Sequence, residues 1–231
     1  MSNIAIIPAR GGSKRIPRKN IRPFLGKPIL AYVIDAALRS GLFSEVMVST
    51  DDEEIAGIAR TYGASVPFMR QAETANDFAT TADVLGEVLN QYAQKGSTYD
   101  YACCLYPTAP FITPTLLQRA FSTLTNKQFD TVYPIQRFGF PIQRAVLLND
   151  EKVQWFQPEH ALTRSQDLEP AYHDAGQFYF FNTKTFEQTL RLITNHSGGI
   201  IVPEMEAHDI DTEEDWQVAE FKFKLRLMQD V

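Results

Sequence analysis

The stretch IAIIPARGGSKRIPRKNIRPFLGKPI, residues 4–29, joins a short apolar run to a strongly basic segment. The apolar run ends at Pro8 and predicts a buried strand. A helical repeat follows at residues 28–41, with Pro28 in its first turn and Gly41 after its end. The basic segment at residues 10–22 holds six of the 22 Lys and Arg residues of a chain whose net charge is −6. The sequence therefore predicts a positively charged loop directly after a first buried strand.

The same alternation of strand and helix continues through about residue 135. Extended apolar patterns cover residues 3–9, 44–50, 64–70, 100–107 and 130–136, and helical patterns cover residues 28–41, 51–63, 80–96 and 113–127. Asp51 and Asp52 begin the second helical pattern, where carboxylates accept bonds from the free N–H groups. Such alternation with short connections is typical of a parallel sheet covered by helices on both faces. We expect a Rossmann-like three-layer α/β/α fold.

The pattern changes after residue 135. Residues 136–182 are rich in Pro, Gln, Phe and Arg, with strand-like pieces at residues 152–156 and 176–181. These features predict a β-rich lobe inserted into a single domain that spans residues 1–231. The chain then ends with a strand-like segment, residues 208–211, and a long helix whose Thr212 and Asp215 resemble a capping box.

Composition excludes several classes of protein. No apolar run approaches the roughly 20 residues needed to span a bilayer, and the first residues lack a signal-peptide pattern. Cys103 and Cys104 are adjacent inside an apolar run, which indicates buried thiols in a reducing cytoplasm. The negative net charge argues against bulk nucleic-acid binding. We expect a cytoplasmic protein with no membrane and no nucleic-acid partner.

The basic loop has the position and chemistry of a phosphate site. Open parallel sheets bind ligands outside the carboxyl ends of their strands. Gly11 and Gly12 allow a tight turn, and Arg10, Lys14 and Lys19 supply positive charge for phosphate oxygens. The spacing is not that of a Walker loop. A solvated basic loop or an RGG-like RNA contact is the alternative reading.

Acidic residues gather near the other end of the chain. Residues 204–215 hold seven carboxylates in twelve positions. If residues 208–211 form a strand, Asp209 and Asp211 lie on one face and Ile210 points into the core. Two oxygen ligands on one face suit Mg²⁺, which is held by one or two carboxylates together with substrate phosphates. The alternative is a pair of exposed acids before a helix.

Several motifs occur in the order typical of one enzyme family. They are IPARGGSK at residues 7–14, Lys19–Asn20, VSTD at residues 48–51, RQAETANDFATT at residues 70–81, PTAP at residues 107–110 and DIDT at residues 209–212. Together they resemble the CMP-sialic acid synthetase family of cytidylyltransferases, over nearly the whole chain. Two features depart from the sialic acid enzymes: Tyr106, and the sequence HDAG at His173–Gly176. Both are most similar to the branch that uses pseudaminic acid for flagellar or surface glycans.

The resemblance implies transfer of CMP from CTP to the anomeric hydroxyl of a nine-carbon nonulosonic acid, with release of pyrophosphate. It implies Mg²⁺ or Mn²⁺ on Asp209 and Asp211, which with Arg10 and Lys19 would be the catalytic residues. The implied nucleotide-binding residues are Ala9, Arg10, Gly11, Ser13, Lys14, Lys19, Asn20, Arg70, Ala79 and Thr81. Of these, the resemblance implies cytidine contacts for Asn20, Arg70, Ala79 and Thr81. The implied sugar-binding residues are Tyr106, Gln143, Arg144, His173 and Gln177.

The resemblance also implies a homodimer, because in relatives the inserted lobe is exchanged between subunits. The alternatives that remain are a cytidylyltransferase for N-acetylneuraminic, legionaminic or Kdo-type acids, and a non-catalytic nucleotide- or RNA-binding module.

Overall fold

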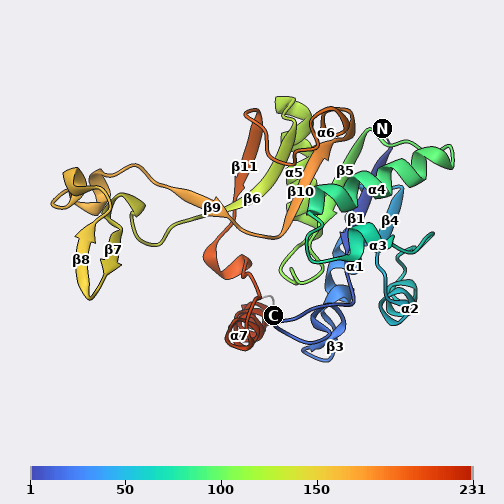
Figure 1. Ribbon diagram of the computed structural model, residues 1–231, viewed down its shortest axis with the longest axis horizontal. Coiled ribbons are helices and arrows are strands. Elements are labelled where there is room, and N and C mark those ends of the chain that lie inside the picture. Colours follow the sequence, from blue (N-terminus) through green and yellow to red (C-terminus); the bar gives the residue numbers. More distant parts are fainter. Residues whose placement is uncertain (1, 230–231) are drawn as a thin grey trace.

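A seven-stranded sheet runs through the centre of the protein (Figure 1). The computed structural model describes residues 2–229. The sheet has the order β11-β6-β10-β5-β1-β4, with β9 paired to β6 outside this path. Its strands are β1 (Asn3–Pro8), β4 (Glu45–Ser49), β5 (Tyr101–Leu105), β6 (Thr131–Arg137), β9 (Tyr172–Asp174), β10 (Phe178–Asn182) and β11 (Ser197–Ile201).

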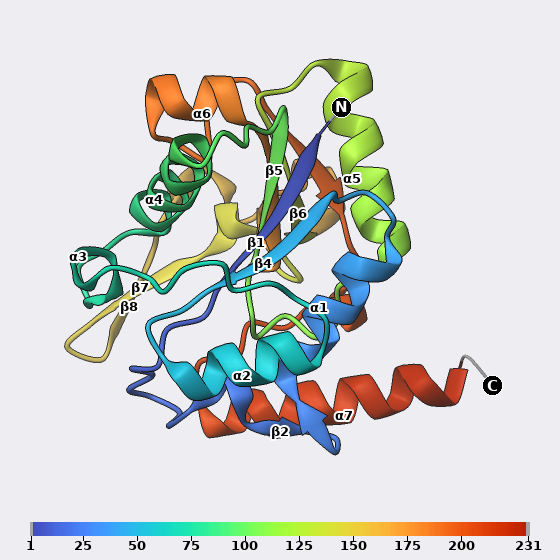
Figure 2. The same cartoon turned by 90° about the vertical axis from the view of Figure 1, so that its right-hand side faces the viewer.

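The predicted three layers are present. The helices are α1 (Ile29–Arg39), α2 (Glu53–Thr61), α3 (Ala72–Ala75), α4 (Thr81–Gln94), α5 (Pro114–Lys127), α6 (Thr183–Thr189) and α7 (Glu213–Gln229). One apolar cluster joins the strands to α1, α2 and α5, and a second joins the opposite face to α4 and α6. Figure 2 shows α4 and α6 on one side of the strands and α5 on the other. Alternate residues of β1 supply both clusters, Ile7 the first and Ile6 the second, as expected for a strand buried on both faces.

The sheet is mixed, although the alternating pattern predicted a parallel one. β1 is parallel to β4 and β5, whereas β10 is antiparallel to both β5 and β6. After β6 the chain makes a long excursion and returns to the end of the sheet at which β6 stops. A strand that starts from that end enters the sheet antiparallel, and no crossover helix is needed.

A third apolar cluster joins the two ends of the chain. Phe24 belongs to a small hairpin formed by β2 (Pro23–Phe24) and β3 (Lys27–Pro28). Its ring packs edge-on against Trp216 and Phe223 of α7, with centroids 5.7 and 5.5 Å apart. Ile210 is fully buried in the same cluster. This packing brings the acidic segment beside the basic loop.

The excursion after β6 forms an arm that extends away from the sheet (Figure 1). It carries a hairpin of β7 (Val146–Asn149) and β8 (Lys152–Trp155). Short 3-10 helices lie at Ile142–Arg144, Pro158–His160 and Ser165–Asp167 in the arm, and at Lys19–Ile21 and Glu204–Glu206 elsewhere. The arm covers fewer residues than the predicted lobe of residues 136–182, because β9 and β10 belong to the central sheet.

Two predicted strands are wrong, and three predicted helix caps are confirmed. Residues 64–70 make only an isolated bridge between Met47 and Ser65, since Pro67 cannot donate to a ladder. Residues 208–211 are not a strand, because no neighbouring strand pairs with them. Asp52, Thr113 and the Thr212–Asp215 pair cap their helices as expected. Among the helices of residues 2–229, none combines the length and the apolar character that crossing a membrane requires.

Candidate functional site

The loop after β1 is held by the corner between β4 and α2. The N–H of Ala9 donates to the carbonyl of Ser49, and the N–H of Gly11 donates to Oδ1 of Asp51, both at 2.9 Å. A Cβ on Gly11 would lie 2.7 Å from Oδ2 of Asp52, so the loop can approach this corner only with glycine at position 11. The start of the basic loop therefore has a defined path before any ligand binds.

Arg18 belongs to the scaffold of the loop. Its guanidinium donates to both carboxylate oxygens of Asp52, and this contact is the main cause that lowers the pKa of Asp52 to about 2. The same carboxylate accepts the N–H groups of Glu54 and Ile55 at the start of α2. One ionised side chain thus holds the loop and caps a helix.

Two adjoining cavities open at the carboxyl ends of β1 and β5. The first has a volume of about 450 Å³ and is lined by predicted phosphate, metal and sugar residues: Arg10, Ser13, Lys14, Lys19, Tyr106 and Asp209. The second has a volume of about 200 Å³ and is lined by residues predicted to contact the cytidine: Arg70, Ala79 and Thr81. Pro8, Arg10 and Tyr106 line both cavities, so these three residues mark the junction between them.

Two cations of the first cavity, Arg10 and Lys14, are paired with an acid that was not predicted as a site residue. Asp77 contacts Arg10 Nη1 at 2.8 Å and Lys14 Nζ at 2.5 Å. Lys14, and then Arg10, lower the pKa of this carboxyl from its ordinary value. Its only sequence signal was its place inside the motif at residues 70–81. A triphosphate that used Arg10 and Lys14 would have to displace Asp77.

The acidic segment meets the same cavity from the other side. Lys19 Nζ donates to the carbonyl of Ile210 at 2.6 Å and lies 3.6 Å from Asp211 Oδ1. Arg15 approaches that oxygen to 2.7 Å. Burial, followed by the neighbouring charge of Asp211, raises the pKa of Asp209. Residues about 190 positions apart in the chain therefore form one site.

A divalent cation at the acid pair stays a prediction. Burial, and then the charge of Asp211, make the ionised form of Asp209 unfavourable, and a bound cation would favour it. Within residues 2–229 no group of three or more His, Cys, Asp or Glu side chains could hold a metal ion. Oxygens of a substrate and water would therefore complete the coordination, as is usual for Mg²⁺.

The second cavity has a rigid wall. Arg70 is 8% exposed; its Nε donates to Ser49 Oγ at 3.0 Å and its Nη2 to the carbonyl of Ser49 at 2.5 Å. Burial lowers the pKa of Arg70. Thr80 forms a capping box with Asp83 and so starts α4 next to Thr81. The side chain of Arg70 and the start of α4 beside Thr81 are thus held by hydrogen bonds within the protein.

Asn20 lines the first cavity, not the second, although it was predicted to contact the cytidine. Its Nδ2 donates to the carbonyl of Arg10 at 2.9 Å. This bond ties the two ends of the basic loop together and gives Asn20 a structural part in the site.

The predicted sugar residues divide into two groups. Tyr106 lines the cavities, and its N–H donates to the carbonyl of Gln177, whose side chain is buried behind it. His173 is exposed on β9, and Gln143 and Arg144 lie on the arm, where they bond to the Glu169 carbonyl and to Ser165 Oγ. A single chain does not bring these last three residues to the cavities.

Ala175 also lies outside the cavities. It belongs to the HDAG stretch, residues 173–176, that departs from the sialic acid enzymes. Ala175 is 4% exposed and packs in the main apolar core. Its small size is explained by packing against the sheet.

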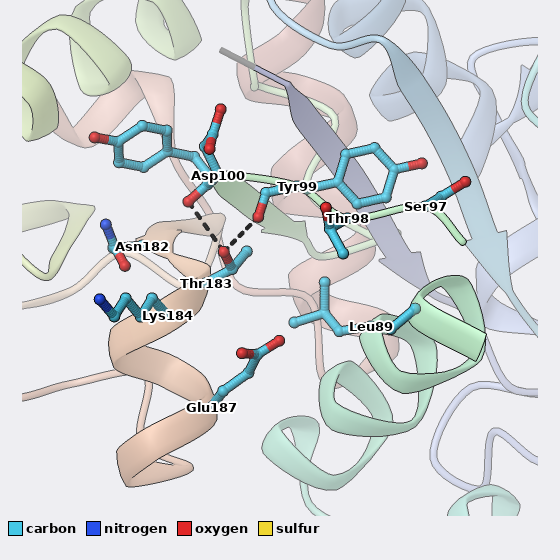
Figure 3. A pocket seen from close by; sticks show the side chains of 11 residues that line it. Leu89, Ser97, Thr98, Tyr99, Asp100, Asn182, Thr183, Lys184 and Glu187 are labelled. Carbon is cyan, nitrogen blue, oxygen red and sulfur yellow. Dashed lines mark hydrogen bonds between the residues drawn. The ribbon is translucent and has the colours of Figure 1, made fainter. Parts of the chain in front are cut away.

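A further cavity of about 480 Å³ lies near the opposite end of β5, between α4 and α6 (Figure 3). Thr183 Oγ1 donates there to the carbonyls of Tyr99 and Asp100. Leu89, Lys184 and Glu187 complete the part of its wall that Figure 3 shows most clearly. None of the predicted site residues lines this cavity, and it does not contain the basic loop or the acid pair.

Comparison with known proteins shows the family of the chain. The sequence profile of a family described as Cytidylyltransferase matches residues 4–225. The chain is 42% identical over 226 residues to the pseudaminic acid cytidylyltransferase of Campylobacter jejuni, covering 97% of both chains. It is 33% identical to the CMP-N,N′-diacetyllegionaminic acid synthase of Legionella pneumophila, covering 95% of both. The solved structure of a CMP:2-keto-3-deoxy-manno-octonic acid synthetase complexed with CTP matches the full length of both chains with a TM-score of 0.70 at 17% identity.

Proposed function

The chain belongs to the cytidylyltransferase family of nucleotidyltransferases, and we propose that it transfers CMP from CTP to pseudaminic acid. The anomeric hydroxyl oxygen of the acceptor would attack the α-phosphorus, form the new P–O bond and expel pyrophosphate. The observation that carries the proposal is the meeting of the basic loop and the Asp209–Asp211 pair around one cavity, beside a second cavity walled by Arg70, Ala79 and Thr81.

Charge neutralisation explains the basic loop. Phosphoryl and nucleotidyl transfer depend mainly on positioning and on stabilising the charge that develops on phosphate oxygens. Arg10, Lys14 and Lys19 would hold the triphosphate, with Ser13 and the backbone of Ala9 and Gly11 beside it. Because the loop is already tied to the β4–α2 corner, little of the binding energy is spent on ordering it.

The second cavity suits the cytosine. Arg70 is fixed by Ser49, and the backbone beside Ala79 offers a carbonyl that could accept a bond from the exocyclic amine of cytosine. Uracil carries an oxygen at that position, so the same carbonyl would face an acceptor. An unpaired buried polar group costs about 1–3 kcal/mol, which favours CTP over UTP.

Asp209 and Asp211 would hold Mg²⁺, with Mn²⁺ as a replacement. When bound, the ion supplies Lewis-acid stabilisation of phosphate charge and lowers the pKa of the attacking hydroxyl. Lys19 keeps the acidic segment against the loop through the Ile210 carbonyl. We place the reaction in the cytoplasm, which fits the two free buried thiols, Cys103 and Cys104.

The acceptor can be identified by direct comparison. With CTP and Mg²⁺ held constant, we expect kcat/KM for pseudaminic acid to exceed that for N-acetylneuraminic acid by about tenfold to a hundredfold. The reason is that extra hydroxyls without partners lose about 1–3 kcal/mol each. Pyrophosphate release measures the reaction. Support comes from the 42% identity to a pseudaminic acid enzyme and from Tyr106 at the junction of the cavities.

The same assay tests the alternatives. Higher efficiency with N-acetylneuraminic, legionaminic or Kdo-type acids would reassign the acceptor and keep the reaction class. Absence of pyrophosphate release with every acceptor would contradict the enzyme assignment. RNA binding that weakens steeply with salt would favour the RNA-binding alternative instead.

We also propose that the protein is a homodimer in which the arm packs on the second copy. The arm exposes large apolar side chains that the rest of the chain does not cover: Phe140, Leu148, Val153, Phe156 and Leu162 are 58–97% exposed. Such a patch is typical of an interaction surface. A partner arm could also deliver Gln143 and Arg144 to a site that they do not reach within one chain.

Light scattering tests this assembly. We expect a mass near twice 26.2 kDa for the wild type and a monomer for the Leu148→Asp/Val153→Asp variant, whose substitutions lie on exposed positions of β7 and β8. Leu190→Asn is a matched control, because Leu190 is 61% exposed outside the arm and has a positive φ that asparagine accepts. A monomeric wild type, or a dimeric double variant, would contradict the proposal.

A further inference from the structure

Three side chains form a chain of contacts behind the junction of the two cavities. Asp174, at the end of β9, accepts the hydroxyl of Tyr179 with Oδ2. Its Oδ1 accepts the N–H of Gly176 at 2.8 Å. Both oxygens of one carboxylate are thus used, one to shape the turn into β10 and one to orient a tyrosine.

Tyr179 in turn contacts Tyr106. The two rings meet edge-on at an angle of 80°, with centroids 5.9 Å apart. Tyr179 is 8% exposed, and Tyr133 packs against its other side at 5.4 Å. Burial raises the pKa of Tyr106, and the hydroxyls of Thr81 and Tyr179 partly offset this rise. Both tyrosines therefore stay protonated near neutral pH and act as oriented hydroxyls.

The same turn lies near Asp209 of the acid pair. Gly176 has a φ of +64°, and a Cβ at this position would lie 3.8–3.9 Å from the carboxyl group and Cβ of Asp209. The next residue, Gln177, accepts the N–H of Tyr106 with its carbonyl at 2.9 Å. One short segment, residues 174–179, therefore contacts Tyr106 at the junction of the cavities and passes close to Asp209, the proposed metal ligand.

We propose that Asp174 and Tyr179 are positioning residues that fix Tyr106 and so set the approach of the acceptor to the α-phosphate. The inference rests on the proposed function. Tyr106 lines both cavities, and the new bond must form where nucleotide and acceptor meet. The contacts that hold Arg70 and the basic loop come from Ser49, Asp51 and Asp52, which are not part of this chain of contacts. Loss of the Tyr179 hydroxyl should therefore affect the acceptor much more than CTP.

Tyr179→Phe tests the inference in the full-length enzyme with CTP, Mg²⁺ and pseudaminic acid. It keeps the ring and removes only the hydroxyl that donates to Asp174. We expect kcat/KM for the acceptor to fall about tenfold, the scale of one buried hydrogen bond, while KM for CTP changes by less than about twofold. Tyr99→Phe is the matched control, because Tyr99 lies at the cavity near the opposite end of β5, and it should behave as wild type.

A double-mutant cycle separates positioning from a general loss of stability. If Tyr179 acts through Tyr106, the Tyr106→Phe/Tyr179→Phe variant should be no more than about twofold worse than Tyr106→Phe alone. Additive losses, or equal losses of acceptor and CTP efficiency in Tyr179→Phe, would overturn the inference. If the wild type is active and Tyr179→Phe has unchanged kinetics, this inference is overturned and the proposed function stands. A wild type inactive with CTP and every nonulosonic acid would overturn the proposed function and this inference together.

Discussion

The Asp209→Asn/Asp211→Asn variant is expected to lose at least about a thousandfold in kcat, because a metal ion that stabilises phosphate charge is worth several kcal/mol. Asp209 lines the first cavity, and Asp211 lies 3.6 Å from Lys19, which also lines it. The fold should survive, since the buried residue of this segment is Ile210, whose side chain is unchanged. Turnover at saturating CTP and Mg²⁺, together with the thermal midpoint, measures both effects.

Glu213→Gln is the matched control for this variant. Glu213 lies in the same acidic segment but pairs with Arg22 at 2.5 Å and lines neither cavity. We expect it to keep nearly wild-type turnover. A double Asn variant that retained more than about a tenth of the Mg²⁺-dependent activity would contradict the metal assignment.

Arg10→Ala is expected to lower kcat by about a hundredfold to a thousandfold, the scale of removing one charged donor from a developing phosphate charge. Arg10 is the only cation that lines both cavities in the part of the chain that the structure describes. The fall in kcat should exceed the rise in KM for CTP. If KM alone changes, Arg10 serves only to bind the nucleotide.

Asp77→Asn controls for the second contact that Arg10 makes. The guanidinium of Arg10 bonds to Asp77 and to the carbonyl of Asn76 in the unliganded protein, so its loss could disturb that loop. Asp77→Asn removes the ion pair and keeps Arg10. We expect it to retain turnover with an unchanged or lower KM for CTP, because the triphosphate no longer competes with this carboxylate. An equal loss in both variants would assign the effect of Arg10→Ala to the loop.

Local sequence determined much of the fold and part of the site. Apolar runs and helical repeats predicted β1, β4, β5, β6 and the helices around them, since burial and cap chemistry act within a few neighbouring residues. Asp52, Thr113 and the Thr212–Asp215 pair were readable as helix caps for the same reason. The family motifs selected the residues of the basic loop and the acid pair.

Tertiary structure alone decided how these pieces meet. The apolar run of β10 was assigned to the inserted lobe, because hydrophobicity does not encode which strand a segment pairs with or in which direction. The prediction that Asp209 and Asp211 share one face assumed that residues 208–211 form a strand, and they do not. Their position comes from Ile210 packing with Phe24 and Trp216, and from Lys19 bonding to the Ile210 carbonyl.

The contacts between the basic loop and the carboxylates of Asp77 and Asp52 could not be predicted from the sequence either. Asp77 contacts Arg10 and Lys14. Asp52 lies so close to residue 11 that only glycine fits there. These contacts join residues 41 to 67 positions apart. Ion pairing and close packing depend on distances in space, which the sheet order sets and which no local pattern carries.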